Sequence, residues 1–296
     1  MHKQHKIGNL SSRYRMVGWI FIIPAAFFIC FSKFYPMIKA LLLSFQKGMG
    51  ANLTFAGLDN YIRLFGDKLF LTALSNTLIY LAIQVPVMLF LAIIFATILN
   101  NRHLRFKGFF RTMIFLPCVT AAVSYSLVFR SLFMTNGLIN TILQNMNIIQ
   151  SPINWLGEAW LARIVIVIAI TWRWTGYNTI FYLAGLQQIE PSVYEAATID
   201  GAGPIRRFFN ITIPLLRPMI LLTAITSTNG TLQLFAEPRN ITNGGPANAT
   251  IAVSNYIYNL SFDSVPRFGY ASAISYIVFI IIAVLALIQM KVGDKR

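Results

Sequence analysis

The sequence predicts an all-α integral membrane protein with six transmembrane helices and a cytoplasmic helix-turn-helix between helices 4 and 5. Of its 296 residues, 56% are hydrophobic and only 11% are charged, whereas a soluble globular protein carries about 25% charged residues. Six apolar runs each reach the length of about 20 residues that a membrane-spanning helix needs. Polar and helix-breaking residues are concentrated instead in one stretch, Tyr194–Pro218, between two of these runs.

The six predicted spans follow one another along nearly the whole chain. The first run is over-long and contains Lys33, Pro36 and Lys39, so we expect it to leave the membrane near Lys33 and continue as an interfacial helix. No run alternates strongly enough to predict a membrane β-barrel. The spans are Val17–Phe45, Leu71–Leu99, Phe109–Phe133, Leu161–Leu186, Leu215–Phe235 and Tyr270–Met290.

Basic residues predict the orientation of these spans. The formal net charge of +15 could indicate nucleic-acid binding, but the lysines and arginines fall mostly between the apolar runs, as the positive-inside rule requires of a membrane protein. Both termini are therefore predicted to be cytoplasmic, and no nucleic-acid partner is needed. The whole chain, residues 1–296, is expected to form one transmembrane domain, with residues 1–16 as a cytoplasmic segment and 190–214 as a cytoplasmic loop. The residues that carry this prediction are Lys3, Lys6, Arg13, Arg15, Arg102, Arg105, Lys107, Arg111, Arg206, Arg207, Arg217, Lys291, Lys295 and Arg296.

The loop between the fourth and fifth spans predicts two short helices joined by a tight turn. Ser192 and Glu195 have the spacing of a capping box at the start of the first helix. Gly201 and Gly203 permit a positive φ, and Pro204 cannot continue a helix, so the first helix should end there and a second should begin. The Thr212–Pro214 segment is expected to end that second helix before the fifth span.

This loop resembles the EAA loop of permease subunits of ATP-binding-cassette importers. The loop matches at Glu195-Ala196-Ala197, Gly201, Ile211 and Pro214, and departs mildly where Ile213 replaces the usual leucine. The resemblance to the carbohydrate branch of that family extends from the second span to the sixth. It is carried further by the stretches Trp172–Gly203, Phe115–Phe133 and Asn240–Thr250.

The resemblance implies a permease subunit of a bacterial carbohydrate importer in the cytoplasmic membrane. Its expected partners are a second, similar permease, two ATPase subunits and an extracytoplasmic sugar-binding protein. ATP and magnesium are expected on the ATPase subunits, because no Gly-Lys pair of a phosphate-binding loop occurs in this chain. The family's coupling contacts to the ATPase would fall on Glu195, Ala196, Ala197, Asp200 and Gly201.

Two other classes of function are weighed against this one. An ion-coupled secondary transporter usually carries acidic residues or histidine at membrane depth, but all of these residues fall outside the predicted spans, with Glu237 at one edge. Sodium sites built from backbone carbonyls remain open. An intramembrane enzyme would need a nucleophile and base or a metal cluster, and no such constellation is visible.

Candidates for the substrate path are polar and aromatic residues within the spans, because such groups often face a cavity or a partner helix. Asn229 and Gln233 are four residues apart in the fifth span and should share a helical face. All of these side chains could instead join helices to one another. Arg173 lies between two tryptophans, where cation–π packing is expected. Disaccharides, oligosaccharides and glycerol phosphate are all compatible with the motifs. The candidates are Tyr125, Trp172, Trp174, Asn178, Thr226, Asn229 and Gln233.

Overall fold

The computed structural model describes residues 8–50, 52–101, 104–263 and 265–293. By length and composition, four of its helices could cross a membrane, and two bent helix pairs raise the number to as many as six. This agrees with the six predicted spans. The expected N-terminal cytoplasmic segment falls partly on residues 1–7, outside the described residues. Five of the basic residues used to predict the orientation also lie outside the described residues: Lys3, Lys6, Arg102, Lys295 and Arg296. The three histidines, His2, His5 and His103, lie outside them as well.

The chain divides into two compact units, one of which combines the residues up to Arg63 with Leu260–Tyr276. Its first helix does not break at Lys33: backbone helicity continues through a π-helical segment, and Val17–Ser44 remains one candidate span. A short antiparallel hairpin follows, with Gln46 opposite Phe55. The elements are α1 (Gly8–Ile29), η1 (Cys30–Phe34), α2 (Tyr35–Ser44), β1 (Gln46–Met49), β2 (Asn52–Phe55) and α3 (Asp59–Gly66), which runs into the second unit.

Hydrogen bonds fasten the hairpin and the start of α3 to the end of α2. The amide of Asn60 is buried and donates to the carbonyls of Ser44 and Gln46, each at 2.8 Å. The start of α14 (Phe268–Gly293) packs closely against the hairpin. A Cβ on Gly269 would stand 1.9 Å from the Gln46 carbonyl oxygen. Only glycine permits this approach, which holds the first turn of α14 against the hairpin.

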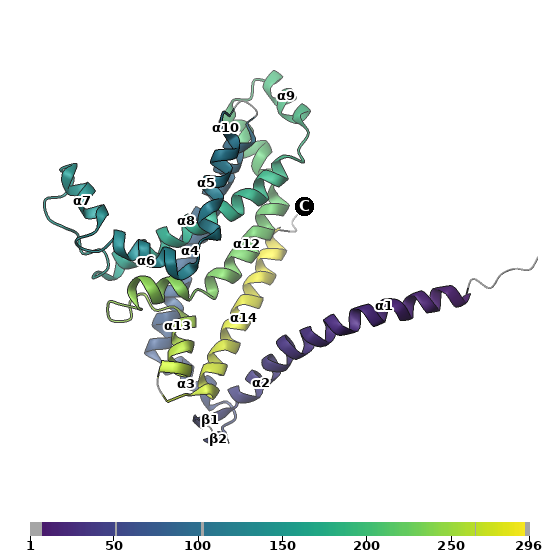
Figure 1. The fold of residues 1–296 in the computed structure, drawn as a ribbon, viewed down its shortest axis with the longest axis vertical. Helices are drawn as coiled ribbons and strands as arrows, with labels where there is room; N and C mark the ends of the chain where they lie inside the picture. Colours follow the sequence, from purple (N-terminus) through teal and green to yellow (C-terminus); the bar gives the residue numbers. More distant parts are fainter. Residues whose placement is uncertain (1–7, 51, 102–103, 264, 294–296) are drawn as a thin grey trace, which may run out of the picture. The chain divides into compact units, whose positions relative to one another are not determined.

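The second unit, Leu64–Asn259 with Ile277 onward, is built on the long helices α4 and α8, which pack along one another (Figure 1). Asp67 caps α4 by accepting hydrogen bonds from the backbone of Leu69 and Phe70. Helix α12 packs on both α4 and α8. The further elements are α4 (Lys68–Asn100), α5 (Lys107–Val119), α6 (Ala122–Leu132), α7 (Leu138–Asn145), α8 (Ala159–Leu186), α9 (Pro191–Ile199), α10 (Pro204–Arg207), η2 (Phe208–Thr212), α11 (Ile213–Leu215), α12 (Arg217–Leu232), η3 (Pro238–Thr242), α13 (Val253–Tyr258) and η4 (Asn259–Asp263).

Two predicted spans are bent rather than straight. The run Phe109–Phe133 forms α5 and α6, whose axes differ by 99°, because Thr120 and Ala121 adopt extended backbone after Pro117. The fifth span begins with a 70° bend at Leu216. The prediction that Thr212–Pro214 would end the preceding helix is wrong, since helical structure continues through Pro214 to Leu215. Pro214 lies just after the π-helical segment η2 (Phe208–Thr212), and the helix ends one residue after this proline.

Candidate functional site

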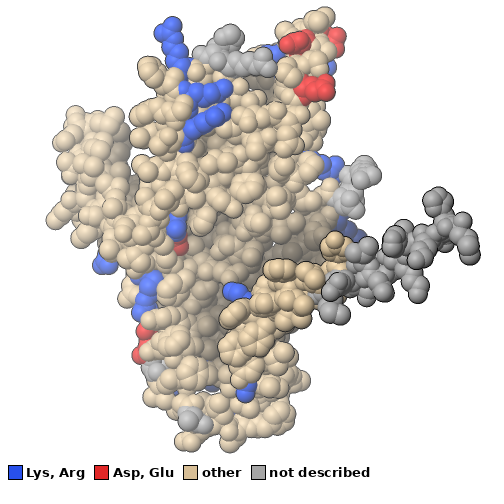
Figure 2. All heavy atoms as spheres, turned by 45° about the vertical axis from the view of Figure 1, so that its right-hand side comes forward, with Lys and Arg blue, Asp and Glu red and all other residues tan. Residues whose placement is uncertain are grey.

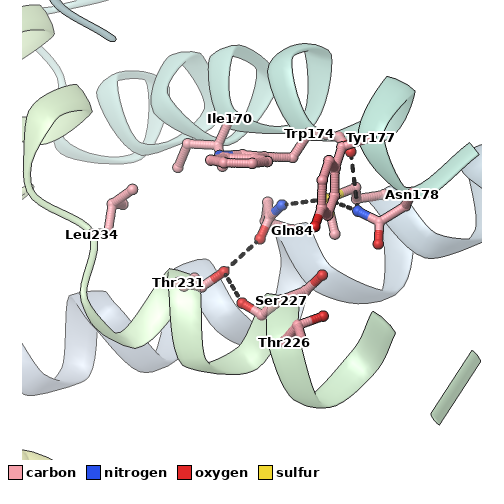
Figure 3. Close-up of a pocket in the computed structure, with 11 residues that line it drawn as sticks. Gln84, Ile170, Trp174, Tyr177, Asn178, Thr226, Ser227, Thr231 and Leu234 are labelled. Atoms are coloured by element: carbon pink, nitrogen blue, oxygen red, sulfur yellow. Dashed lines mark hydrogen bonds between the residues drawn. The ribbon is translucent and has the colours of Figure 1, made fainter. Parts of the chain in front are cut away.

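A cavity of about 220 Å³ lies where α4, α8 and α12 converge. Figure 3 shows Trp174 and Tyr177 of α8 facing Gln84 of α4 and the hydroxyl-bearing face of α12. The described residues that line this cavity carry no formal charge. They are Gln84, Met88, Ile170, Trp174, Tyr177, Asn178, Thr226, Ser227, Gly230, Thr231 and Leu234.

The amides of the cavity are only partly satisfied by hydrogen bonds within the chain. The Oγ1 of Thr231 donates to Oε1 of Gln84 at 2.9 Å, which joins α12 to α4. The Nδ2 of Asn178 donates to the Trp174 carbonyl at 3.0 Å. Its Oδ1 is buried and has no partner within the described part of the chain. A buried acceptor without a partner is costly, so Asn178 is a lining residue whose hydrogen-bonding capacity the described chain leaves unfilled.

The structure brings some of the predicted substrate-path residues together and separates others. Asn178, Trp174 and Thr226 line the cavity. Asn229 and Gln233 share a face as predicted, with Gln233 Nε2 donating to Asn229 Oδ1 at 2.6 Å, but both are exposed and lie outside the cavity lining.

Tyr125 and Trp172 also lie outside that lining. Their rings belong to an aromatic cluster with Phe129, in which the Tyr125 and Trp172 centroids are 6.1 Å apart. Sequence reasoning missed the other lining residues, four of which have polar side chains: Gln84, Tyr177, Ser227 and Thr231.

A buried ion pair adjoins the cavity lining at Trp174. Arg173 lies 3.6 Å from the carboxylate of Glu237, whose side chain is 4% exposed. The Tyr125 hydroxyl donates to the same carboxylate. The Arg173 guanidinium also packs against two rings, Tyr125 and Trp174, at 5.0 Å each. The predicted cation–π packing is thus found with Trp174, whereas Tyr125 takes the place expected for Trp172. Glu237, placed by the sequence at the edge of a span, is a buried charge.

The second candidate site is the elbow between α8 and α12, defined as residues 190–216. Gly201 adopts φ +73°, a left-handed conformation that terminates α9. Gly203 is also expected to permit a positive φ, but its φ is −64°. The predicted capping box is wrong: Pro191 occupies the first helical position, which makes Glu190 the N-cap, and Ser192 therefore falls inside the helix.

Side-chain hydrogen bonds hold the two arms of the elbow together. Arg207 Nη1 donates to Thr198 Oγ1 at 2.7 Å. The hydroxyls of Tyr194 and Thr212 are 3.1 Å apart. These contacts join α9 to the arm that leads into α12, so a force on α9 would move the start of α12 as well.

The outer surface of the elbow is exposed and carries both charge and apolar side chains. Glu195, Ala196 and Asp200 are exposed, and Ala197 is half-buried. Ile199 and Ile205 are 87% and 75% exposed. Figure 2 shows acidic side chains gathered at the end of the molecule where Figure 1 places α9. Exposed isoleucines beside small and acidic residues are typical of a surface that docks another protein.

Comparison with known proteins identifies relatives along the full chain. The family model described as binding-protein-dependent transport system inner membrane component matches residues 64–296. The lactose transport system permease protein LacF of Rhizobium radiobacter is 49% identical over 97% of each chain. The trehalose/maltose transport system permease protein MalF of Thermococcus litoralis is 31% identical, again over 97% of each chain. A bacterial alginate ABC transporter, crystallised with a pentasaccharide-bound periplasmic protein, contains a chain with a TM-score of 0.83 at 21% identity, covering 98% of both chains.

Proposed function

This chain belongs to the family of binding-protein-dependent transport system inner membrane components, and we propose that it is one permease subunit of an ATP-driven carbohydrate importer. The relatives named for lactose and for trehalose/maltose support this function over nearly the whole chain. The observation that carries it is the cavity between α4, α8 and α12, whose lining combines two amides, three serine or threonine hydroxyls and the rings of Trp174 and Tyr177. Sugars bind through amide hydrogen bonds and aromatic stacking, and the cavity offers both.

The expected substrate is a neutral di- or oligosaccharide. Uncharged amide, hydroxyl and aromatic groups line the described cavity, and Arg173 nearby is paired with Glu237. A sugar acid would bring an uncompensated charge into this site, which is costly without a paired cation. The alginate importer chain shares the fold and handles an acidic polysaccharide, so charge is a useful discriminator within this architecture.

The elbow is the proposed contact with the ATPase subunits. Glu195, Ala196, Ala197, Asp200 and Gly201 would form the docked surface. Because hydrogen bonds join α9 to the arm that precedes α12, closure of the ATPases would rotate α12, and α12 supplies one wall of the cavity. ATP and magnesium would be bound by those partners, so this chain would act as a transporter subunit rather than an enzyme.

The assembled importer would contain a second permease, two ATPase subunits and an extracytoplasmic sugar-binding protein. The chain would cross the bacterial cytoplasmic membrane several times with both termini on the cytoplasmic side. Arg206 and Arg207 in the elbow support this orientation by the positive-inside rule. The binding protein would then meet the opposite side, which holds the Asn-rich connection around α7.

Purification of the tagged chain from its native membrane in mild detergent tests this function, with co-purifying proteins identified by mass spectrometry. We expect an ATPase, a second permease and a binding protein, and ATP-dependent uptake of a neutral sugar after reconstitution in liposomes. A chain that purifies alone and drives uptake without ATP would instead establish an ion-coupled carrier, for which the buried Glu237 would be the first residue to test.

A further inference from the structure

A second hollow, on the first unit, has the opposite chemistry to the sugar cavity. It is formed by the β1–β2 hairpin, α3 and the start of α14, and it has a volume of about 480 Å³. We call it the basic hollow, because three of its lining residues are cations: Lys47, Arg63 and Arg267. Asn60 and Tyr270 complete its polar lining.

Two of these cations have no acidic partner among the residues that the structure describes. Lys47 forms an ion pair with Asp59 at 3.0 Å, which compensates its charge. Arg63 stacks on the Tyr270 ring at 4.3 Å, so an aromatic side chain holds its guanidinium in place. Neither Arg63 nor Arg267 has an ion pair or side-chain hydrogen bond with any other described residue. Two guanidinium groups with unused N–H donors are suited to bind an oxyanion, above all a phosphate.

The basic hollow lies at the ends of two membrane spans. Lys47 follows the candidate span Val17–Ser44 by three residues, and Arg267 immediately precedes the span Phe268–Gly293. Cations one to three residues outside an apolar span lie at the depth of the lipid headgroups, where tyrosine side chains are also enriched. Phosphate groups of lipids occupy this same layer.

Large apolar side chains are exposed close to these cations in the sequence. Phe55, Leu58 and Ile62 are 80%, 60% and 69% exposed. Phe55 ends β2, Leu58 directly precedes α3, and Ile62 lies within α3. Phe262 and Val265, just before Arg267, are similarly exposed. Apolar side chains around a cationic centre match an amphiphile that has both acyl chains and an anionic head.

We propose that the basic hollow is a binding site for an anionic phospholipid. The phosphate would accept hydrogen bonds from Arg63 and Arg267, and the acyl chains would cover Leu58, Ile62 and the neighbouring apolar surface. A lipid with net negative charge, such as phosphatidylglycerol, is favoured over zwitterionic phosphatidylcholine because two cationic charges are otherwise uncompensated. The site is separate from the sugar cavity and from the elbow, and it does not depend on the identity of the transported solute.

Native mass spectrometry of the full-length chain in detergent tests this site by titration with phosphatidylglycerol or phosphatidylcholine. The double variant Arg63→Gln/Arg267→Gln should bind phosphatidylglycerol about 30-fold more weakly, since each cation near an anionic lipid surface contributes on the order of a fivefold gain. Phosphatidylcholine binding should change little. The matched control is Arg130→Gln, which removes an exposed arginine of α6 and should leave the preference for phosphatidylglycerol intact.

Three further results bear on the occupant. A second variant, Leu58→Ser/Ile62→Ser, should weaken phosphatidylglycerol binding without removing a charge, and wild-type behaviour in both double variants would overturn the site. If millimolar inorganic phosphate displaces the lipid completely, the hollow is a free-phosphate site instead. If lipid binding is unchanged but the arginine variant loses the sugar-binding protein in the pull-down, the hollow is a protein-docking surface and the lipid proposal is wrong.

Discussion

The cavity between α4, α8 and α12 and the elbow of residues 190–216 belong to the same unit but are built by opposite means. The cavity is assembled from three helices far apart in sequence, and the Gln84–Thr231 hydrogen bond that closes one side joins residues 147 positions apart. The elbow is assembled locally, with its Thr198–Arg207 hydrogen bond spanning nine positions. Side chains of the cavity are mostly buried, whereas α9 contributes no buried residue.

This difference indicates how the two regions should respond to substitution. A local, exposed structure can lose its binding partner without losing its fold. A buried structure of long-range contacts loses packing and ligand binding together. Substitutions in the elbow should therefore separate ATPase docking from stability, and substitutions around the cavity should separate sugar handling from ATPase docking.

The largest effect on transport is expected from reversing the charge of the elbow. Glu195→Lys places a cation on the exposed face of α9, beside Ala196. Loss of a central docking contact typically costs 2 kcal/mol or more, or about 30-fold in affinity. We expect the ATPase to be lost from the pull-down and uptake to fall to background, while the thermal stability of the chain stays unchanged.

Glu158→Lys is the matched control for that charge reversal. Glu158 is exposed and precedes α8, on the side proposed to be extracytoplasmic. The same charge change there should leave co-purification of the ATPase intact. Loss of the ATPase in both variants would show that charge reversal acts through stability or insertion, and the contrast between the two regions would fail.

The buried ion pair beside the cavity should give the largest loss of stability. Glu237→Gln leaves the largely buried Arg173 without its counter-charge, and breaking a buried pair from one side costs about 3 to 5 kcal/mol. We expect a lower thermal unfolding midpoint in detergent. The double variant Arg173→Gln/Glu237→Gln should recover part of that loss. A double variant less stable than Glu237→Gln alone would show that each residue stabilises the chain mainly through its other contacts.

A smaller effect is expected from the cavity itself. Asn178→Ala removes an amide from the cavity lining and with it one proposed hydrogen bond to sugar, which corresponds to about tenfold weaker transport at low substrate. Uptake assays in proteoliposomes measure it, and co-purification of the ATPase should not change. Asn229→Ala makes the same substitution on the exposed face of α12 and should have less effect. If Asn229→Ala reduced uptake more than Asn178→Ala, the substrate path would instead run along the face of Asn229 and Gln233.

The sequence predicts the elbow better than the cavity, for the same physical reason. The left-handed turn at Gly201 and the two short arms follow from local rules for glycine and proline. The capping box failed because Pro191 fixed the helix start two residues earlier than a Ser192 N-cap requires. Gln84 and Thr231, the 99° bend between α5 and α6, and the Arg173–Glu237 pair depend on tertiary packing. The sequence on either side of each of these features is ordinary for a membrane helix. Periodicity and helix propensity therefore do not predict the bend or the long-range contacts.

The smallest effect should come from the turn of the elbow, where two glycines provide an internal comparison. A Cβ would meet no atom within 4 Å at either Gly201 or Gly203, so steric contact does not distinguish them. Only Gly201 has a positive φ, +73°. Gly201→Ala should therefore cost about 1 kcal/mol of turn stability, seen as roughly fivefold weaker binding of the ATPase. Gly203→Ala, at φ −64°, should bind it as the wild type does. Equal weakening of ATPase binding by both substitutions would mean that the ATPase contacts this turn closely. The positive φ of Gly201 would then not be what orients α9.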